Sequence, residues 1–509
     1  MAAKISLALA AAKFCLQLSA LRPYGYFRDE LYYLACANHL DWGYVDHPPL
    51  SIAILSTWRA LFGDSIAAIR LMPAIFGALN VLTVGLVVVE LGGGALAAGL
   101  ACFSLFCAPG LAGSDHIYSM NAIDHALWCA TALLMLRALD APSDKRWIVL
   151  GFALGLGLEN KIDVLWLGAG LAVSLVVLSD LRPLLKTRGP YLCAAVAFAL
   201  FAPYLAWEAS RGFPTLEFMR NATASKYIRL SPFDLVRESA MAMNPMTFVL
   251  AVVGVVASFA SPAQRRGRPL AVIFVTTLGI VLATKGAKSE YLDAAYSLAV
   301  APGAIACERT IARKNGSIMK IALGVCVGAM LVLFAIALPF GLPVLSERAF
   351  IAYATRLGVT PHSSEKKELG ELPQFYADMH GWDDLVGMTK SVYDALPADE
   401  RSRARIWAVT GGYGSAAAID VLGRRVGLPG AISGHNSYWL WGYGSDDEGP
   451  VILLGGDEER LRGVFDDLTR VGTVECGACM PYENHKPIYV GRKMRMSWRE
   501  LWPKAQHYE

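Results

Sequence analysis

Two adjacent carboxylates, Asp29 and Glu30, stand in an aromatic stretch near the start of the chain. The stretch reads YGYFRDELYYLACANHLDWGYVDHPPL over residues 24–50 and closes with Asp46 and His47. A carboxylate can take the proton of a hydroxyl group as that group attacks another molecule. We interpret this stretch as a catalytic loop, and the rest of the chain as the elements that hold it and supply its substrates.

The acids also have a purely structural interpretation. Asp29 could cap a helix that begins at Glu30, because aspartate is common at helix N-termini. Glu30 could simply favour the first turn of that helix, where the helix dipole stabilises negative charge. For Asp29 alone the two interpretations are evenly matched, and the surroundings of the loop decide between them.

The composition places this loop in a membrane protein. Of the 509 residues, 55% are hydrophobic and 17% are charged, whereas ordinary soluble domains carry about 25% charged residues. Long apolar runs fill residues 1–342, and residues 343–509 have the composition of a soluble domain. We expect a mainly α polytopic domain followed by a soluble α/β domain. The net charge of +3 is too small to indicate nucleic-acid binding.

Eleven apolar segments are candidates for membrane helices. The first contains Lys13 and Gln17, so it is better explained as a helix packed in a bundle than as a signal peptide. The segments are 5–22, 66–89, 95–110, 121–139, 148–160, 163–180, 190–207, 243–260, 270–284, 292–307 and 318–340.

Basic residues in short connections predict the orientation. Because such loops stay on the cytoplasmic side, the N-terminus is expected inside and the soluble domain outside. The residues are Lys145, Arg146, Arg182, Lys186, Arg188, Arg265, Arg266, Arg268, Arg309, Arg313, Lys314 and Lys320.

The opposite connections then face outwards: 23–65, 110–120, 159–163, 208–242 and 285–291. Two of them, 208–242 and 285–291, are rich in Lys and Arg, against the usual bias. An anionic ligand at the outer membrane face would explain these basic residues. The alternative for 208–242 is that a loop of this length is translocated whatever its charge.

The soluble part shows strand and helix signals in alternation. Residues 405–410, 451–455 and 487–490 are typical of strands, and 416–425 of a helix. The GGYG sequence between the first strand and the helix lacks the full dinucleotide fingerprint, so we interpret it as a tight turn. Cys476 and Cys479 form a lone CxxC, for which a disulfide is favoured over zinc in an external domain.

The run RDELYYLACANHLDWGYVDHPPL resembles the first external loop of bacterial glycosyltransferases similar to protein O-mannosyltransferases and lipid A aminoarabinose transferases. The stretches YSMNAIDHALW, GLGLENK, KGAKSEYLDAAYSLAVAPGA, SGHNSYWLWG and MPYENHKPIYVGR agree with it. The resemblance implies a GT-C membrane fold (glycosyltransferase family 39-like) and a polyprenyl-phosphate sugar as donor. It covers most of the chain, and its first loop is the most specific part.

The resemblance implies roles for individual residues. Asp29 matches the acid that activates or engages the acceptor, Glu30 completes the pair, and Asp124 matches a second external-loop acid. Basic positions near the donor phosphate correspond to Lys161, Lys285 and Lys288, with Tyr291 beside them; Arg229 lies on the same face and joins this set as a candidate. The remaining loop residues are expected to line the acceptor or sugar pocket: Tyr32, Tyr33, Trp42, Asp46, His47 and Tyr118.

The chain also departs from the family pattern. Asn121 stands where many relatives have Asp, and Ile162 and Asp163 follow ENK where relatives often have His. Both changes put a shared metal site in doubt. Asp115, His116 and His47 are the remaining candidate ligands, and a lone histidine beside prolines or at a helix start is more often structural.

These observations predict an inverting glycosyltransferase that moves a hexose or pentose to a hydroxyl-bearing envelope glycan, lipid or protein. Two other classes stay open. A transporter or flippase of a lipid-linked sugar would also place charges in a membrane bundle, but usually shows repeated halves. A non-catalytic carbohydrate-binding assembly protein would use SGHNSYWLWGYG as a stacking surface. Loss of the acidic pair would abolish an enzyme and leave a binding protein's affinity intact.

Overall fold

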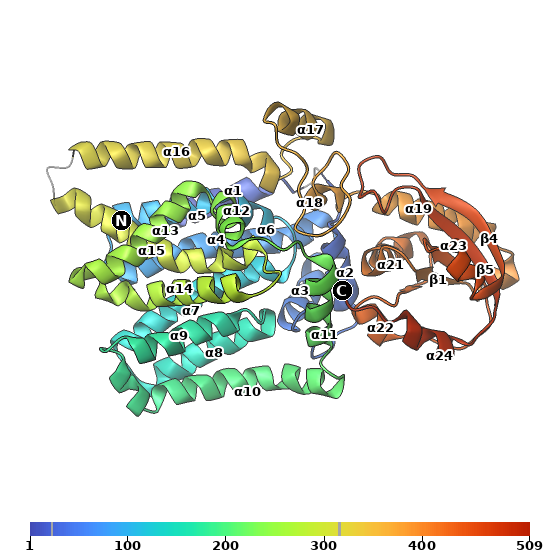
Figure 1. Ribbon diagram of the computed structural model, residues 1–509, viewed down its shortest axis with the longest axis horizontal. Helices are drawn as coiled ribbons and strands as arrows, with labels where there is room; N and C mark the ends of the chain where they lie inside the picture. Colours follow the sequence, from blue (N-terminus) through green and yellow to red (C-terminus); the bar gives the residue numbers. More distant parts are fainter. Residues whose placement is uncertain (22–23, 314–316) are drawn as a thin grey trace.

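The computed structural model describes residues 1–21, 24–313 and 317–509. A bundle of helices forms one end of the molecule, and a domain built on a β-sheet forms the other (Figure 1). The C-terminus lies where the two parts meet, whereas the N-terminus lies near the far end of the bundle (Figure 1). Lys314 and the ends of the predicted segments at residues 22 and 23 fall outside the described residues.

In the described part of the chain, a helix lies at each of the eleven predicted apolar segments. They are α1 (Ala2–Leu18), α4 (Ile66–Glu90), α5 (Ala95–Phe106), α7 (Met120–Asp140), α8 (Asp144–Asn160), α9 (Val164–Val177), α10 (Gly189–Ser210), α13 (Pro245–Ala260), α14 (Arg268–Ala283), α15 (Asp293–Arg313) and α16 (Ser317–Gly341).

Among the described residues, five stretches are long and apolar enough to cross a membrane: Ile66–Glu90, Met120–Asp140, Gly189–Ser210, Pro262–Ala283 and Lys320–Gly341. A sixth results if α12 (Pro232–Ala242) and α13, bent by 110°, form one span. The chain is therefore a multi-pass membrane protein. Crossing by all eleven helices stays a prediction, because α5 and α9 have 12 and 14 residues and a span needs about 20.

The basic connections gather at the end of the bundle that is far from the sheet domain. Arg266 pairs with Asp140 and lies 3.7 Å from Glu90, so the ends of α4 and α7 meet the segment before α14. The 3-10 turns η1 (Arg182–Lys186) and η3 (Pro262–Gly267) supply further cations there. This clustering is what the positive-inside rule expects of one membrane side; the orientation itself stays a prediction.

Short elements connect the long helices toward the opposite end of the bundle (Figure 1). They are α2 (Arg28–Ala37), α3 (Leu50–Phe62), α6 (Pro109–Ser114), α11 (Pro214–Asn221), the π-helix η2 (Ala222–Lys226), α12 and η4 (Ser289–Leu292). The helix at the acidic pair begins at Arg28, not at Glu30 as expected, because the Glu30 carboxylate accepts the backbone N–H of Phe27 at 2.9 Å. Glu30, and not Asp29, thus caps α2.

The soluble part contains a five-stranded mixed sheet in the order β2-β1-β3-β5-β4. Strands β1, β2 and β3 are parallel, and β5 is antiparallel to both β3 and β4. The elements are α17 (Glu347–Arg356), α18 (Gln374–Ala377), α19 (Trp382–Ala395), α20 (Ala398–Arg401), β1 (Arg405–Ala408), α21 (Gly412–Val421), η5 (Gly423–Val426), β2 (Ala431–Ile432), α22 (Ser437–Trp441), β3 (Val451–Leu454), α23 (Glu458–Arg462), β4 (Phe465–Val474), β5 (Lys486–Met494), α24 (Trp498–Leu501) and η6 (Trp502–Ala505).

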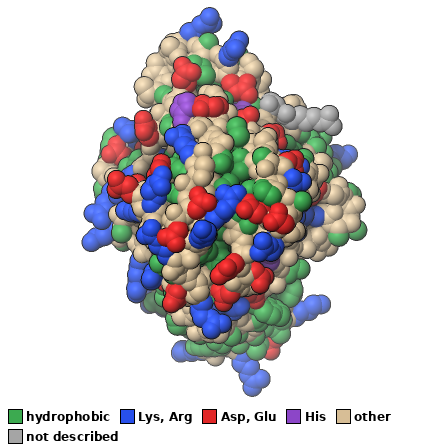
Figure 2. Space-filling model, turned by 90° about the vertical axis from the view of Figure 1, so that its right-hand side faces the viewer, with side chains coloured by type: hydrophobic (Ala, Val, Ile, Leu, Met, Phe, Trp, Pro, Cys, Tyr) green, Lys and Arg blue, Asp and Glu red, His purple; other side chains and the backbone are tan. Residues whose placement is uncertain are grey.

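The three predicted strands are confirmed as β1, β3 and β5, whereas β2 and β4 were not predicted. Most residues of β4 are exposed or half-buried, so this strand has no apolar run that would reveal it. The outer end of the domain shows acidic and basic side chains interspersed (Figure 2), as suits a surface in water.

The two faces of the sheet pack against different partners. Ile406 and Ile452 belong to the same core as residues of α19, α21 and α2. Trp407 and Leu453, their neighbours along the strands, pack with Trp498 of α24 on the other face. Helix α2 therefore lies between the bundle and α21, which explains why nine of its ten residues are buried.

The GGYG sequence forms the tight turn expected from the sequence. Gly411 and Gly412 have φ angles of 79° and 51°, which favour glycine. A Cβ on Gly412 would lie 1.9 Å from the His435 ring. The turn brings Tyr413, the second residue of α21, close to the start of α2.

Candidate functional site

Asp29 is the partly exposed acid in the otherwise buried first turn of α2. Its side chain is 37% exposed. One oxygen, Oδ1, accepts a hydrogen bond from the Tyr413 hydroxyl at 2.8 Å and lies 3.4 Å from Arg28 Nε. The other oxygen, Oδ2, has no hydrogen bond or ion pair with any described residue, so it is free to accept a proton from a ligand.

Arg28 joins Asp29 to the soluble part. Its Nη1 donates to the Tyr482 hydroxyl at 3.0 Å and lies 3.6 Å from an Asp378 carboxylate oxygen. Its backbone N–H donates to the Asp378 carbonyl at 3.0 Å. Burial raises the pKa of Asp378 to about 6, although Arg28 acts in the opposite direction. The start of α2 is thus held by a buried polar network from the soluble part.

Glu30 has a different environment from Asp29. It pairs with Arg70 at 2.9 Å, neither side chain is exposed, and it accepts the backbone N–H of Tyr118 at 2.9 Å. His116 Nε2 lies 3.3 Å from Arg70, and burial together with Arg70 lowers the pKa of His116. Glu30 therefore fixes α2 on the bundle and does not face a ligand in this structure.

Basic side chains converge near Asp29 from the bundle. Lys226 lies 3.6 Å from Glu365, and Lys288 lies 4.7 Å from the centre of the Tyr227 ring. Burial raises the pKa of Glu365, but Lys226, Arg28 and Lys288 outweigh it and hold the pKa at about 2. Glu365 is therefore an anion surrounded by three cations.

A cavity of about 630 Å³ opens at this junction. Arg28 and Tyr413, the two residues bonded to Asp29 Oδ1, are among its walls, together with Lys226 and Glu365. The turns after β1 and β2 form the rest of one side, so the cavity lies at the carboxyl ends of parallel strands, where α/β domains usually bind ligands. The remaining wall residues are Lys366, Lys367, Glu368, Pro481, Tyr482, Ala505, His507 and Glu509.

The other predicted basic residues are more scattered. Lys161 is bound by two acids, Asp163 at 2.8 Å and Asp124 at 3.5 Å. Burial raises the pKa of Tyr291, whereas the nearby cations Lys288 and Lys161 lower it. The structure leaves two other candidates exposed, with no ion pair among the described residues: Lys285 and Arg229.

The residues expected to line an acceptor or sugar pocket do not line this cavity. Asp46 accepts the Tyr32 hydroxyl at 2.9 Å, and Trp42 is 65% exposed, away from these walls. The others are buried: Tyr32, Tyr33, His47 and Tyr118. The sequence did not reveal this because α2 is covered on both sides, so its aromatic rings pack in the core.

Two of the three candidate metal ligands, Asp115 and His116, lie beside cations. Asp115 pairs with Lys13 at 3.0 Å, and His116 lies against Arg70. Both positions therefore face a fixed positive charge, which would repel a metal ion. In the described ranges, no group of three or more His, Cys, Asp or Glu is placed to hold a metal.

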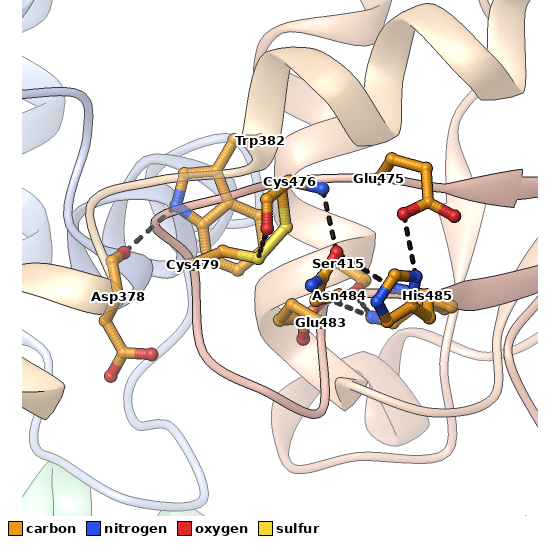
Figure 3. The surroundings of a disulfide bond; sticks show 10 residues. Asp378, Trp382, Ser415, Glu475, Cys476, Cys479, Glu483, Asn484 and His485 are labelled. Carbon is orange, nitrogen blue, oxygen red and sulfur yellow. Dashed lines mark hydrogen bonds and ion pairs between the residues drawn. A yellow bond between two sulfur atoms is a disulfide. The ribbon is translucent and has the colours of Figure 1, made fainter. Parts of the chain in front are cut away.

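Cys476 and Cys479 form a disulfide in the segment between β4 and β5 (Figure 3). The Cys476 N–H donates to the Asn484 side chain at 2.9 Å, which ties the two ends of this segment together. The neighbouring Trp382 indole donates to the Asp378 carbonyl at 3.0 Å. The disulfide thus lies beside the network that holds Arg28.

Four residues at the site were not predicted: Arg28, Glu365, Tyr413 and Tyr482. Arg28 adjoins the acidic pair and could have been found by its position. The other three lie more than three hundred residues away in the sequence, and no spacing rule links them to α2. They reach α2 from three places in the soluble part: α21 carries Tyr413, the disulfide-bonded segment carries Tyr482, and Glu365 lies between α17 and α18.

Comparison with known proteins supports the predicted resemblance. Residues 46–207 match the family described as dolichyl-phosphate-mannose-protein mannosyltransferase. No curated protein sequence matches the chain. The fold is similar to ArnT from Cupriavidus metallidurans bound to undecaprenyl phosphate, with a TM-score of 0.59, 12% identity, and coverage of 95% of this chain and 97% of that one.

The apo form of the same protein is similar to the same extent, with a TM-score of 0.58 and 13% identity over 95% and 97% of the two chains. Such a likeness covers the soluble part as well as the bundle. The chain is a multi-pass membrane protein with a fold similar to that of ArnT, and its residues 46–207 match the model of the dolichyl-phosphate-mannose-protein mannosyltransferase family, in agreement with the predicted resemblance.

Proposed function

We propose that the chain is an inverting glycosyltransferase that moves a sugar from a polyprenyl-phosphate donor to an acceptor hydroxyl at the external membrane face. The observation that carries the proposal is the free Oδ2 of Asp29, whose hydrogen-bond partners Arg28 and Tyr413 line the cavity. The family match and the undecaprenyl phosphate bound to ArnT support the donor class. The acceptor is an envelope glycan, lipid or protein.

The chemistry is a single displacement. The acceptor oxygen attacks the anomeric carbon from the face opposite the phosphate, and the bond between that carbon and the phosphate oxygen breaks. The bonding electrons leave with the phosphate, and Asp29 Oδ2 takes the proton of the acceptor hydroxyl. A positioned base must lie within about 3 Å of that proton's oxygen, and it contributes about 10²–10⁴-fold in rate.

The leaving phosphate gains negative charge as the bond breaks, and nearby cations stabilise it. Lys288 is the strongest candidate, because it lies over Tyr227 and contributes to the charge field around Glu365 near Asp29. Lys288 and Lys161 both lower the pKa of Tyr291, so both cations act on this ring. We assign a supporting role to Lys161, since Asp124 and Asp163 already neutralise it, and Asp124 acts through this lysine.

The test is Asp29→Asn, which keeps the shape of the side chain and removes the base. Membrane vesicles from cells that make the protein contain donor and acceptor, so product can be followed by mass spectrometry of envelope components. We expect a 10²–10⁴-fold slower transfer with undecaprenyl phosphate binding retained. Asp64→Asn is the matched control, because Asp64 is 42% exposed at the end of the same loop and pairs with Arg59.

Transfer by Asp29→Asn at the rate of Asp64→Asn would remove Asp29 as the base. Unchanged envelope composition on deletion of the whole protein would instead contradict the glycosyltransferase assignment. A flippase is separated by the same assay, because its loss would leave transfer intact in detergent-permeabilised vesicles.

A further inference from the structure

We infer that Tyr413 is a positioning residue for the reaction: it fixes one oxygen of Asp29 and thereby presents the other to the acceptor. The inference rests on the proposed function, in which Asp29 is the base. It assigns to the soluble part a direct role in the orientation of that base, and not only a role in covering the membrane bundle.

The first argument is the distribution of hydrogen bonds on the carboxylate. The Tyr413 hydroxyl donates to Oδ1 at 2.8 Å, and Arg28 Nε lies 3.4 Å from the same oxygen. A carboxylate turns readily about its last torsion, because the rotational preference there is broad. Two donors on one oxygen restrict that rotation, and the free oxygen Oδ2 is then presented in one direction.

The second argument is that Tyr413 is itself held firmly. Its ring centre lies 4.6 Å from that of Tyr32 and 4.8 Å from that of His435. Its backbone N–H donates to His435 Nδ1 at 3.3 Å, and the turn at Gly412 leaves no room for a Cβ. A group locked by packing orients its neighbour at little further entropic cost.

The third argument is chemical. Burial raises the pKa of Tyr413, although Arg28 opposes the change, so the hydroxyl keeps its proton at neutral pH and acts as a donor. A donor to the charged form of a carboxylate stabilises that form. Tyr413 thus keeps Asp29 ready to accept a proton only while α21 is docked against α2, which makes the soluble part necessary for the reaction.

The experiment compares Tyr413→Phe with Tyr438→Phe in the full chain. Tyr438 is the matched control, because it lies in the same domain and its hydroxyl donates to a buried carboxylate, Asp420, at 2.7 Å. Each variant loses one hydroxyl from one tyrosine–carboxylate bond, but only Tyr413 contacts the base. Readouts are the transfer rate in membrane vesicles between pH 5 and 9, undecaprenyl phosphate binding, and thermal unfolding in detergent.

We expect Tyr413→Phe to transfer sugar about 10–100-fold more slowly, within the range that a positioned base contributes. Undecaprenyl phosphate binding should stay within twofold of the parent. The fall in rate at low pH should move to higher pH, because a carboxylate without its donor takes up a proton more readily. Tyr438→Phe should match the parent in pH profile, whatever its unfolding temperature.

Equal rates and equal pH profiles for the two variants would overturn the inference. The inference would also be overturned if both variants lost transfer rate equally and their unfolding temperatures fell equally, because the slower transfer would then result from lower stability. The proposed function fails separately: if Asp29→Asn is fully active, the base is wrong, whereas an inactive Asp29→Asn with an unaffected Tyr413→Phe removes only the positioning role.

Discussion

Arg70 and Glu30 form an ion pair of 2.9 Å that has no exposure to solvent on either side chain. The pair links α4 of the bundle to the first turn of α2, one residue after Asp29. Glu30 also accepts the backbone N–H groups of Phe27 and Tyr118. The position of Asp29 therefore depends on a buried charge pair that does not itself reach a ligand.

Arg70→Met should strongly destabilise the protein, because it leaves Glu30 buried without its cation. Removal of one partner from a buried pair typically costs about 3–5 kcal/mol. The measurement is the thermal unfolding temperature of the full chain in detergent micelles. Arg59→Met is the control, since Arg59 pairs with the partly exposed Asp64, and such pairs contribute about 0–1 kcal/mol. Similar shifts for both variants would contradict a structural role for the buried pair.

Lys288→Ala should impair donor use more than Lys285→Ala. Lys288 lies over the Tyr227 ring and is one of the three cations around Glu365. Lys285, in contrast, is exposed and has no ion pair among the described residues. Loss of a cation that stabilises the leaving phosphate lowers the rate of the chemical step. Donor titrations in membrane vesicles measure both variants under the same conditions. A larger loss of donor use in Lys285→Ala than in Lys288→Ala would assign the phosphate site to Lys285, at the start of the connection 285–291.

The disulfide should contribute to the geometry around Arg28. Cys476→Ser removes a four-residue ring, whose contribution is about 2 kcal/mol by the loop-closure relation. The ring belongs to the segment that carries Tyr482, a hydrogen-bond partner of Arg28. We expect slower transfer along with the lower stability, and no reaction of either cysteine with thiol reagents in intact cells without reductant. Rapid labelling of Cys479 in the parent protein would contradict the bond.

Much of the membrane part could be predicted from the sequence because apolar runs are local signals. Helices lie at all predicted segments, although only five or six stretches of the part of the chain that the structure describes meet the length and apolarity of a span. A cluster of acids and rings within 27 residues also directed attention to Asp29, and the catalytic role of this residue stays a prediction. What could not be predicted was which acid is buried, since Arg70 lies 40 positions from its partner Glu30.

The residues that line the cavity could not be predicted from the sequence either, because they too are far apart along the chain. Tyr413 lies 384 positions from Asp29 and Tyr482 lies 454 positions from Arg28. Their contacts arise where α21 and the segment between β4 and β5 pack against α2. Local patterns described GGYG correctly as a turn, but they carried no information on which residue that turn presents to α2.

Asp378 should give the protein a pH-dependent stability that the Asn variant lacks. Burial raises the pKa of this carboxyl to about 6 from its ordinary value of 3.8, so the folded state binds a proton more tightly than the unfolded state. The contribution to stability is full below pH 3.8 and is lost as the pH rises to about 6. By linkage, the loss amounts to about 3 kcal/mol. Asp378→Asn stays neutral at every pH and should escape this loss.

The measurement is the unfolding temperature of the full chain in detergent micelles from pH 4 to 7.5. We expect the difference between Asp378→Asn and the parent to move in favour of the variant as the pH rises. Asp383→Asn, at an exposed position in the first turn of α19, should follow the parent throughout. A difference that is constant across this range, or that moves in favour of the parent, would show that the Arg28 pair outweighs burial at Asp378 and that this network is held together by charge.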